Sequence, residues 1–277
     1  MDGRAGALLR GRDVREALPP RWHHGVVAAG AAARAPLLAR GARAQAAALE
    51  ASESPGAHRL AGLLRRVADG RLDPAGRVRL AAVEAARRDL LASREEVLRR
   101  GGAPQVVGRV CARASQPPAG ARVLYQAVRA WAPARALELG TCLGVSAAYQ
   151  AVAQERCGGG DLLTLEGYPG LAERAERLWD RLGLQRVRVV VGRFAATLPD
   201  ALAEGPYGYA YVDGHHDGAA TRGYVERIAA ACAPGALLVL DDVDWSPSMA
   251  GAWHDVRHRP DVVASARLGK LGLAVLR

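Results

Sequence analysis

After Pro133 the chain alternates short apolar runs with amphipathic or alanine-rich segments of about a dozen residues. We predict seven strands, at Ala136–Leu139, Leu162–Leu165, Val187–Val191, Tyr209–Val212, Ala236–Leu240, Val262–Ala266 and Leu271–Leu276. Strands that alternate with helices in this way form βαβ units around a mostly parallel sheet. Helices then cover both faces of the sheet, which explains why the runs are mostly apolar.

The last two runs are too close in sequence for a crossover helix to fit between them. They should therefore form an antiparallel hairpin at or near one edge of the sheet. The prediction is a doubly wound α/β fold whose seven-stranded sheet is mostly parallel, with strand 7 antiparallel, preceded by an N-terminal helical extension.

Three parts of the chain differ in pattern. Residues 1–55 are rich in alanine and arginine with weak periodicity, which predicts a loose tail. Residues 56–132 place apolar side chains at helical spacing and form a helical lead-in, in which Asp73-Pro74 begins a long helix that Gly101-Gly102 ends. This lead-in is a candidate lid. Residues 133–277 form the Rossmann-like domain.

The positive charge of the chain is concentrated in its N-terminal part. The formal net charge is +10, and residues 1–119 hold 21 arginines against 11 acidic residues, whereas residues 120–277 hold 17 residues of each sign. The basic part also lacks interleaved aromatic residues apart from Trp22, so the charge is weak evidence for nucleic acid. No apolar run approaches the roughly 20 residues of a membrane span. Scattered single cysteines fit a reducing cytoplasm, where we expect this protein.

A glycine-rich turn follows the first predicted strand. Gly140 and Gly144 let the backbone turn sharply and approach a ligand, and the free N–H groups of the helix that begins near Val145 face this turn. The G-x-x-x-G spacing matches neither a dinucleotide fingerprint nor a P-loop. A purely structural glycine turn has the same pattern.

Acidic residues follow three more strands. Glu166 can accept both ribose hydroxyls of a nucleoside, or it is an exposed carboxylate at a strand end. Asp213, Asp241 and Asp242 should converge over the carboxyl edge of the sheet, where a divalent cation is the usual reason to collect three carboxylates. Oxygen ligands favour Mg²⁺, Ca²⁺ or Mn²⁺ over zinc. Alternatively, some of these residues cap helices or turns.

These motifs resemble those of class I S-adenosylmethionine-dependent methyltransferases. The resemblance extends from about Asp73 to the C-terminus and rests on ALELGTCLGVS (136–146), TLEG (164–167), VDGHH (212–216), PGALLVLDDVDW (234–245) and SPSMAGAW (246–253). The Asp-Gly-x-His and Asp-Asp-x-x-Trp elements look most like the cation-dependent O-methyltransferases of the catechol and caffeoyl-CoA kind and their bacterial relatives. The resemblance implies a seven-stranded sheet, S-adenosylmethionine as cofactor, and Mg²⁺ or another hard divalent cation.

The resemblance also implies roles for individual residues. The implied cofactor-binding residues are Glu138, Gly140, Thr141, Gly144, Ser146, Glu166, Tyr168 and Asp213. Among these, Glu166 would hold the ribose hydroxyls and Tyr168 would lie against the adenine. The implied metal ligands are Asp213, Asp241 and Asp242. Two departures stand out: Arg193 replaces the polar residue that usually faces adenine, and the lysine base of catechol-type enzymes has no counterpart, since Lys270 lies far along the chain.

A hydroxyl acceptor must lose its proton during methyl transfer. His216 or His215 can accept that proton as a general base near Asp213, or one of them only fixes the loop. Trp245 and Trp253 pack the wall of the site or form an aromatic floor for a planar acceptor.

The predicted function is methylation of a hydroxylated small molecule, with no membrane partner. RNA methylation guided by the basic N-terminal part is a rival, but strand 4 lacks the Asn/Asp-Pro-Pro-aromatic element of amino-directed nucleic-acid enzymes. A nucleoside-binding module without catalysis is a second rival, and hydride transfer is disfavoured by the glycine spacing. A homo-oligomer is compatible with the sequence.

Overall fold

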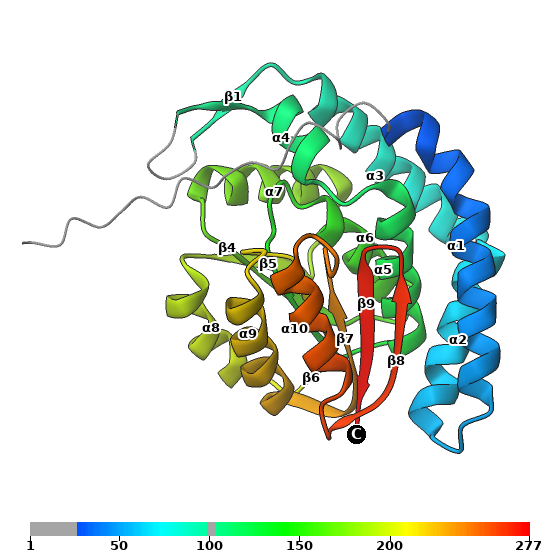
Figure 1. Cartoon of the computed structure of the whole chain (residues 1–277). Coiled ribbons are helices and arrows are strands. Elements are labelled where there is room, and N and C mark those ends of the chain that lie inside the picture. The colour runs from blue at the N-terminus through cyan, green and yellow to red at the C-terminus, as the bar shows by residue number, and fades with distance from the viewer. Residues whose placement is uncertain (1–26, 99–102) are drawn as a thin grey trace, which may run out of the picture.

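The computed structural model describes residues 27–98 and 103–277, with side chains from residue 38 onward. A seven-stranded sheet forms its centre, with strand order β5-β4-β3-β6-β7-β9-β8 (Figure 1). The strands are β3 Arg135–Leu139, β4 Asp161–Glu166, β5 Val187–Val191, β6 Tyr207–Val212, β7 Cys232–Leu240, β8 Val262–Leu268 and β9 Leu271–Leu276. In this order, neighbouring strands from β5 through β4, β3 and β6 to β7 pair in parallel. Strand β9 runs antiparallel to both β7 and β8. The predicted sheet is confirmed, including the antiparallel seventh strand.

Helices bury both faces of this sheet. Along β3, Ala136 belongs to the hydrophobic cluster on one face and Leu137 to the cluster on the other, because successive side chains of a strand point to opposite faces. The helices that follow the strands are α6 Val145–Glu155, α7 Pro169–Leu182, α8 Phe194–Ala203, α9 Gly218–Ala230 and α10 Pro247–Arg257. Side chains of α6 and α7 join the first cluster, and those of α8, α9 and α10 join the second.

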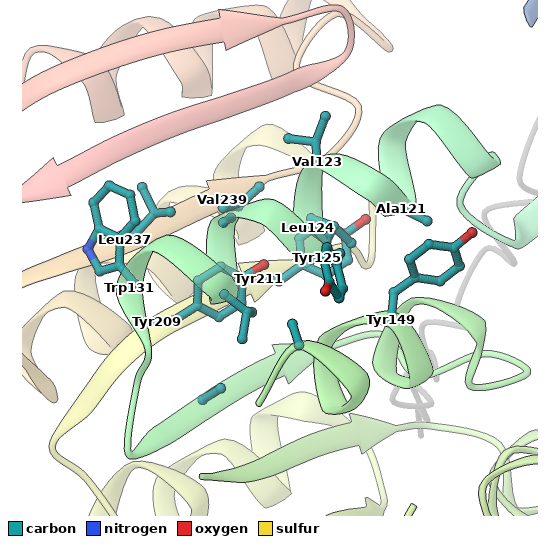
Figure 2. Packing of buried hydrophobic residues seen from close by; sticks show 14 of the residues in the cluster. Ala121, Val123, Leu124, Tyr125, Trp131, Tyr149, Tyr209, Tyr211, Leu237 and Val239 are labelled. Carbon is teal, nitrogen blue, oxygen red and sulfur yellow. The ribbon is translucent and has the colours of Figure 1, made fainter. Parts of the chain in front are cut away.

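The helical lead-in completes the layer on the first face. Its helices are α2 Pro55–Asp69, α3 Pro74–Ala92, α4 Val107–Ala114 and α5 Pro118–Trp131. Figure 2 shows part of the shared cluster, with Leu124 and Tyr125 of α5 near Tyr209 and Tyr211 of β6. The lead-in thus shares its core with the sheet. None of the described helices combines the length and apolar character of a membrane span.

Helix α1 (Val27–Glu50) differs from the loose tail that composition predicts for residues 1–55. It lies along α2 beside β8 (Figure 1), and the small side chains of Ala42 and Ala46 are fully buried there. The side-chain amide of Gln45 accepts from Arg267 N and donates to Arg267 O, both at 2.8 Å, and so occupies part of the free edge of β8. Alanine favours helix, and here it also allows close packing. Residues 1–26 of the expected tail lie outside the described residues.

The long helix of the lead-in ends earlier than its sequence predicts. Ser93 has an extended backbone (φ −66°, ψ 132°), so α3 stops at Ala92. Two short antiparallel strands follow, β1 Glu96–Val97 and β2 Gln105–Val106. Val97 is buried with Leu143 and Leu171 in a small third cluster, which explains why it leaves the helical register. The predicted stop, Gly101-Gly102, lies outside the described residues. The segment therefore packs against Leu143 of the glycine turn and Leu171 of α7.

Candidate active site

The glycine turn after β3 lies against the loop that follows β6. Gly140 and Gly144 have φ angles of 100° and 77°, which glycine adopts more readily than other residues. A Cβ atom on Gly140 would lie 1.8 Å from the carbonyl oxygen of Asp213. The missing side chain therefore lets the two loops meet at the carboxyl edge of the sheet, where the sequence predicts the site.

Glu138 is fully buried at the end of β3. Gln150 Nε2 donates to Glu138 Oε1 at 2.8 Å, and Ser146 and Thr164 also hydrogen-bond to this carboxylate. Burial raises the pKa of Glu138 to about 7, although these hydrogen bonds act to lower it. Oε2 has no hydrogen-bond partner among the described residues. The buried Thr141 hydroxyl lies 2.7 Å from that of Thr164, so the predicted pocket residues Thr141 and Ser146 are both tied to this network.

Glu166 connects the end of β4 to the glycine turn. Its Oε2 accepts a hydrogen bond from Cys142 N at 2.8 Å, and its Oε1 accepts one from Tyr168 N at 2.9 Å. Tyr168 is the residue just before α7. The structure thus brings Glu166 and Tyr168 to the glycine turn, as a nucleoside site requires, while their ribose and adenine contacts stay predictions.

The three predicted carboxylates lie together beyond β6 and β7. The hydroxyl of Tyr211 is 2.9 Å from Asp213 Oδ2 and 2.9 Å from Asp241 Oδ2. Burial raises the pKa of Asp213 well above its usual range, and the charge of Asp241 raises it further. Burial and the charge of Asp241 also raise the pKa of Asp242. The site therefore holds a concentrated negative charge that favours a cation or a proton.

Asp241 is turned into the protein and is 2% exposed. Its Oδ1 accepts a hydrogen bond from Asp242 N at 2.8 Å. Its Oδ2 accepts from Gln116 Nε2 at 2.8 Å and lies 3.0 Å from Lys270 Nζ. Both oxygens are thus engaged by groups of the chain itself.

A group of three potential metal ligands lies beside this buried carboxylate. Asp213, His216 and Asp242 each offer one ligand atom, and these atoms lie within 4.8 Å of one another. His216 Nδ1 is 3.5 Å from Asp242 Oδ2. The group shares Asp213 and Asp242 with the expected trio but holds His216 in place of Asp241. The two carboxylates suit Mg²⁺ or Mn²⁺, whereas an imidazole ligand is more typical of zinc and iron sites.

The two neighbouring histidines face different partners. Both have positive φ angles, 71° at His215 and 42° at His216, which are unfavourable for residues other than glycine. Nδ1 of His215 is 2.9 Å from the hydroxyl of Tyr224 on α9. The ring of His216 lies 5.5 Å from that of Trp245. This unusual turn aims His216 at the carboxylates and His215 away from them.

The two tryptophans that the sequence singles out have different environments. Trp253 is buried in the second hydrophobic cluster, and a Cβ on Gly272 of β9 would lie 2.6 Å from its ring. Trp245 is 47% exposed next to His216. Trp253 therefore belongs to the core, and Trp245 offers an aromatic surface at the site.

Two further residues of the site escape prediction from sequence. Gln116 comes from the segment between α4 and α5, and Lys270 from the turn between β8 and β9. The position of Lys270 could have been predicted from the antiparallel last strand. An antiparallel β9 begins beside the end of β7, and Gly272 does pair with Leu240, which places Lys270 near Asp241. Gln116 has no comparable signal, since its position depends on how the lead-in packs.

Comparisons with known proteins agree with this fold. Residues 137–243 match the family model described as a methyltransferase domain. Among solved structures, the SAH-bound Podospora anserina methyltransferase PaMTH1 is 16% identical, with a TM-score of 0.55 over 74% of this chain and 88% of that chain. A Bacillus cereus O-methyltransferase in complex with SAH is 20% identical, with a TM-score of 0.52 over 75% and 92%.

A third similar structure is TomG, an O-methyltransferase from Streptomyces achromogenes involved in tomaymycin synthesis, in complex with SAM. It is 22% identical, with a TM-score of 0.53 over 74% of this chain and 91% of that chain. A search of curated proteins found no match. The solved structures show the shared fold, and the family model adds the activity class. Residues 137–243 of the chain thus match a methyltransferase domain, and the chain shares the fold of methyltransferases solved with SAM or SAH.

Proposed function

We propose that this protein transfers the methyl group of S-adenosylmethionine to a hydroxyl oxygen of a small acceptor molecule. The observation that carries the proposal is the group formed by Asp213, His216 and Asp242, which lies against the glycine turn of a methyltransferase domain. Such a group can bind and deprotonate a hydroxyl. The Bacillus and Streptomyces proteins are described as O-methyltransferases, which supports oxygen as the accepting atom.

Residues at and just after the carboxyl ends of β3, β4 and β6 would hold the cofactor. We assign Glu138, Gly140, Thr141, Gly144, Ser146, Glu166, Tyr168 and Asp213 to this pocket. They fit the ligand because the buried Oε2 of Glu138 has no partner among the described residues, and a positively charged amino group would satisfy it. Bound S-adenosylmethionine supplies a methyl group on a sulfonium, which needs no further activation by the protein.

The chain itself positions the acceptor and removes its proton. His216 is the general base, because its side chain is 38% exposed and its Nδ1 lies 3.5 Å from Asp242 Oδ2. The carboxylate of Asp242 stabilises the imidazolium that forms. Asp213 orients the acceptor hydroxyl, and the half-exposed ring of Trp245 packs against a planar acceptor. His215 supports the loop through Tyr224.

A divalent cation also fits this site. Asp213, His216 and Asp242 would hold Mg²⁺ or Mn²⁺, and His216 would then be a ligand instead of the general base. Asp241, the remaining predicted ligand, has both oxygens engaged within the protein. When bound, such a cation stabilises the negative charge of a deprotonated hydroxyl. We place the reaction in the cytoplasm, which suits the four free cysteines.

The test is a screen of hydroxylated aromatic molecules and their amino analogues, followed by release of S-adenosylhomocysteine, with Mg²⁺, with Mn²⁺ and with EDTA. We expect release with hydroxyl acceptors and its loss in Asp213→Asn. The Asp200→Asn variant is the matched control, since Asp200 is exposed on α8, away from the site. Release with the amino analogues alone, or with RNA fragments alone, would contradict the proposal. Full turnover in EDTA would show that the reaction needs no divalent cation.

A further inference from the structure

Lys270 is held at the site by its own backbone. It sits in the turn between β8 and β9, next to Gly269, whose φ of 62° permits the reversal. Its carbonyl oxygen accepts a hydrogen bond from Val243 N at 3.0 Å. The turn is thus fastened to the loop that carries Asp241 and Asp242, and the lysine side chain begins close to both carboxylates.

The ammonium group bridges these two carboxylates. Lys270 Nζ lies 3.0 Å from Asp241 Oδ2 and 3.0 Å from Asp242 Oδ1. Its side chain is 36% exposed, while those of Asp241 and Asp242 are 1% and 16% exposed. Burial lowers the pKa of Lys270, but the charges of Asp241, Asp242 and Asp213 outweigh this and raise it above its usual value. The lysine therefore places a positive charge inside a cluster of carboxylates.

The choice of lysine at this position is informative. The chain has 38 lysine and arginine residues, and Lys270 is the single lysine among them. A guanidinium is broad and planar, whereas an ammonium is a compact point charge that fits between two carboxylates. Lys270 thus supplies at this place the kind of concentrated positive charge that a metal ion supplies elsewhere.

We propose that Lys270 is a tethered cation that keeps Asp241 and Asp242 assembled without a metal and weakens divalent-cation binding at Asp213, His216 and Asp242. It is a positioning residue, since it acts through the two aspartates. The inference rests on the proposed function only for the identity of the site. Replacing the ammonium by a neutral side chain leaves three carboxylates with no internal cation, and these attract a divalent cation more strongly.

The experiment measures Mn²⁺ binding by calorimetry, with no acceptor present, in the full chain and three variants. We expect Lys270→Met to bind Mn²⁺ at least tenfold more tightly than the wild type and to gain more in melting temperature when Mn²⁺ is added. Lys270→Arg keeps the charge but places it less compactly, so it should tighten Mn²⁺ binding much less than Lys270→Met does. Arg267→Met is the matched control, because Arg267 lies on the same hairpin and pairs with Asp244, outside the cluster.

Equal Mn²⁺ affinity in the wild type and Lys270→Met would overturn the inference. So would equal tightening in Lys270→Arg or Arg267→Met, because the effect would then not come from the charge at this place. If Lys270→Met does not fold, Lys270→Gln, which retains a hydrogen-bond donor, replaces it under the same criteria. Since no turnover is measured, a failure here is distinct from a failure of the proposed methyl transfer, which the acceptor screen reports.

Discussion

The side-chain amide of Gln116 donates a hydrogen bond to Asp241 Oδ2 across 2.8 Å, although 125 residues separate the two in sequence. The same nitrogen lies 2.8 Å from the hydroxyl of Tyr211. Arg87 of α3 fixes Gln116 in turn, by donating to its backbone oxygen at 2.7 Å. The helical lead-in therefore contributes directly to the electrostatics of the site, through one buried glutamine.

Replacement of Gln116 by leucine should lower both stability and turnover. Asp241 would lose a donor to a buried carboxylate, which costs about 1–3 kcal/mol of unfolding free energy. Urea denaturation measures this loss, and S-adenosylhomocysteine release measures turnover. Gln126→Leu is the matched control, because Gln126 is also buried but donates to the backbone oxygen of Arg71, away from the carboxylates. It should lower stability and leave turnover unchanged. Equal turnover in the two variants would show that Gln116 has no role in the site.

Replacement of Glu166 by glutamine should weaken binding of S-adenosylmethionine about tenfold or more, because hydrogen bonds to a charged acceptor contribute about 1.5–3 kcal/mol. Glutamine retains one acceptor oxygen for Cys142 N or Tyr168 N, so the turn keeps part of its support. Calorimetry measures the affinity. Glu155→Gln, which alters an exposed ion pair with Arg79, is the control and should bind as the wild type does. Unchanged affinity in Glu166→Gln would show that Glu166 does not bind the ribose hydroxyls.

The sheet was predictable because its strands carry a strong local signal. Leu271–Leu276 is a short, continuously apolar run, and Val187–Val191 is apolar except for Arg188; both appear as strands with those bounds. The carboxyl ends of parallel strands share one edge, so the acids that follow them also converge as predicted. The strand order thus determines where many of the site residues lie.

Other features depend on contacts that no local pattern contains. Buried alanines such as Ala42 look the same in sequence as exposed ones, so α1 gave no amphipathic signal. Val97 fits the helical spacing of α3 but is buried against Leu143 instead. Gln116 and Lys270 reach Asp241 only through long-range packing of the lead-in and of the last hairpin. Residues that act on the site from distant elements are therefore the ones that sequence reasoning misses.

Replacement of His216 by alanine should lower kcat about 100-fold or more, which is the usual contribution of a general base. Cofactor affinity should not change, because the ring faces Asp242 and Trp245 rather than the glycine turn. Steady-state kinetics and calorimetry measure the two effects. His215→Ala is the matched variant, since His215 faces Tyr224, and its loss of kcat should be much smaller. Equal losses in both variants would assign the pair a role in loop structure instead of proton transfer.

Glu138 should make stability depend on pH in the absence of cofactor. Burial raises its pKa from 4.5 to about 7 in the folded chain. Between these two values the unfolded chain ionises this carboxyl while the folded chain keeps it protonated, so stability falls as pH rises through the window and levels off above pH 7. The shift corresponds to a loss on the order of 3 kcal/mol.

Glu138→Gln isolates this contribution, because glutamine resembles the protonated acid and does not titrate. Urea denaturation at pH 5 and pH 8 should show a smaller loss of stability in the variant than in the wild type. The other titrating groups, Asp213 and Asp242 among them, are present in both proteins, so their contributions cancel in the comparison. A difference between the two proteins that is the same at both pH values would mean that Glu138 is ionised in the folded chain at pH 5. Its carboxylate, whose Oε2 has no partner among the described residues, would then carry a full charge in the core, and a bound water or cation would have to compensate it.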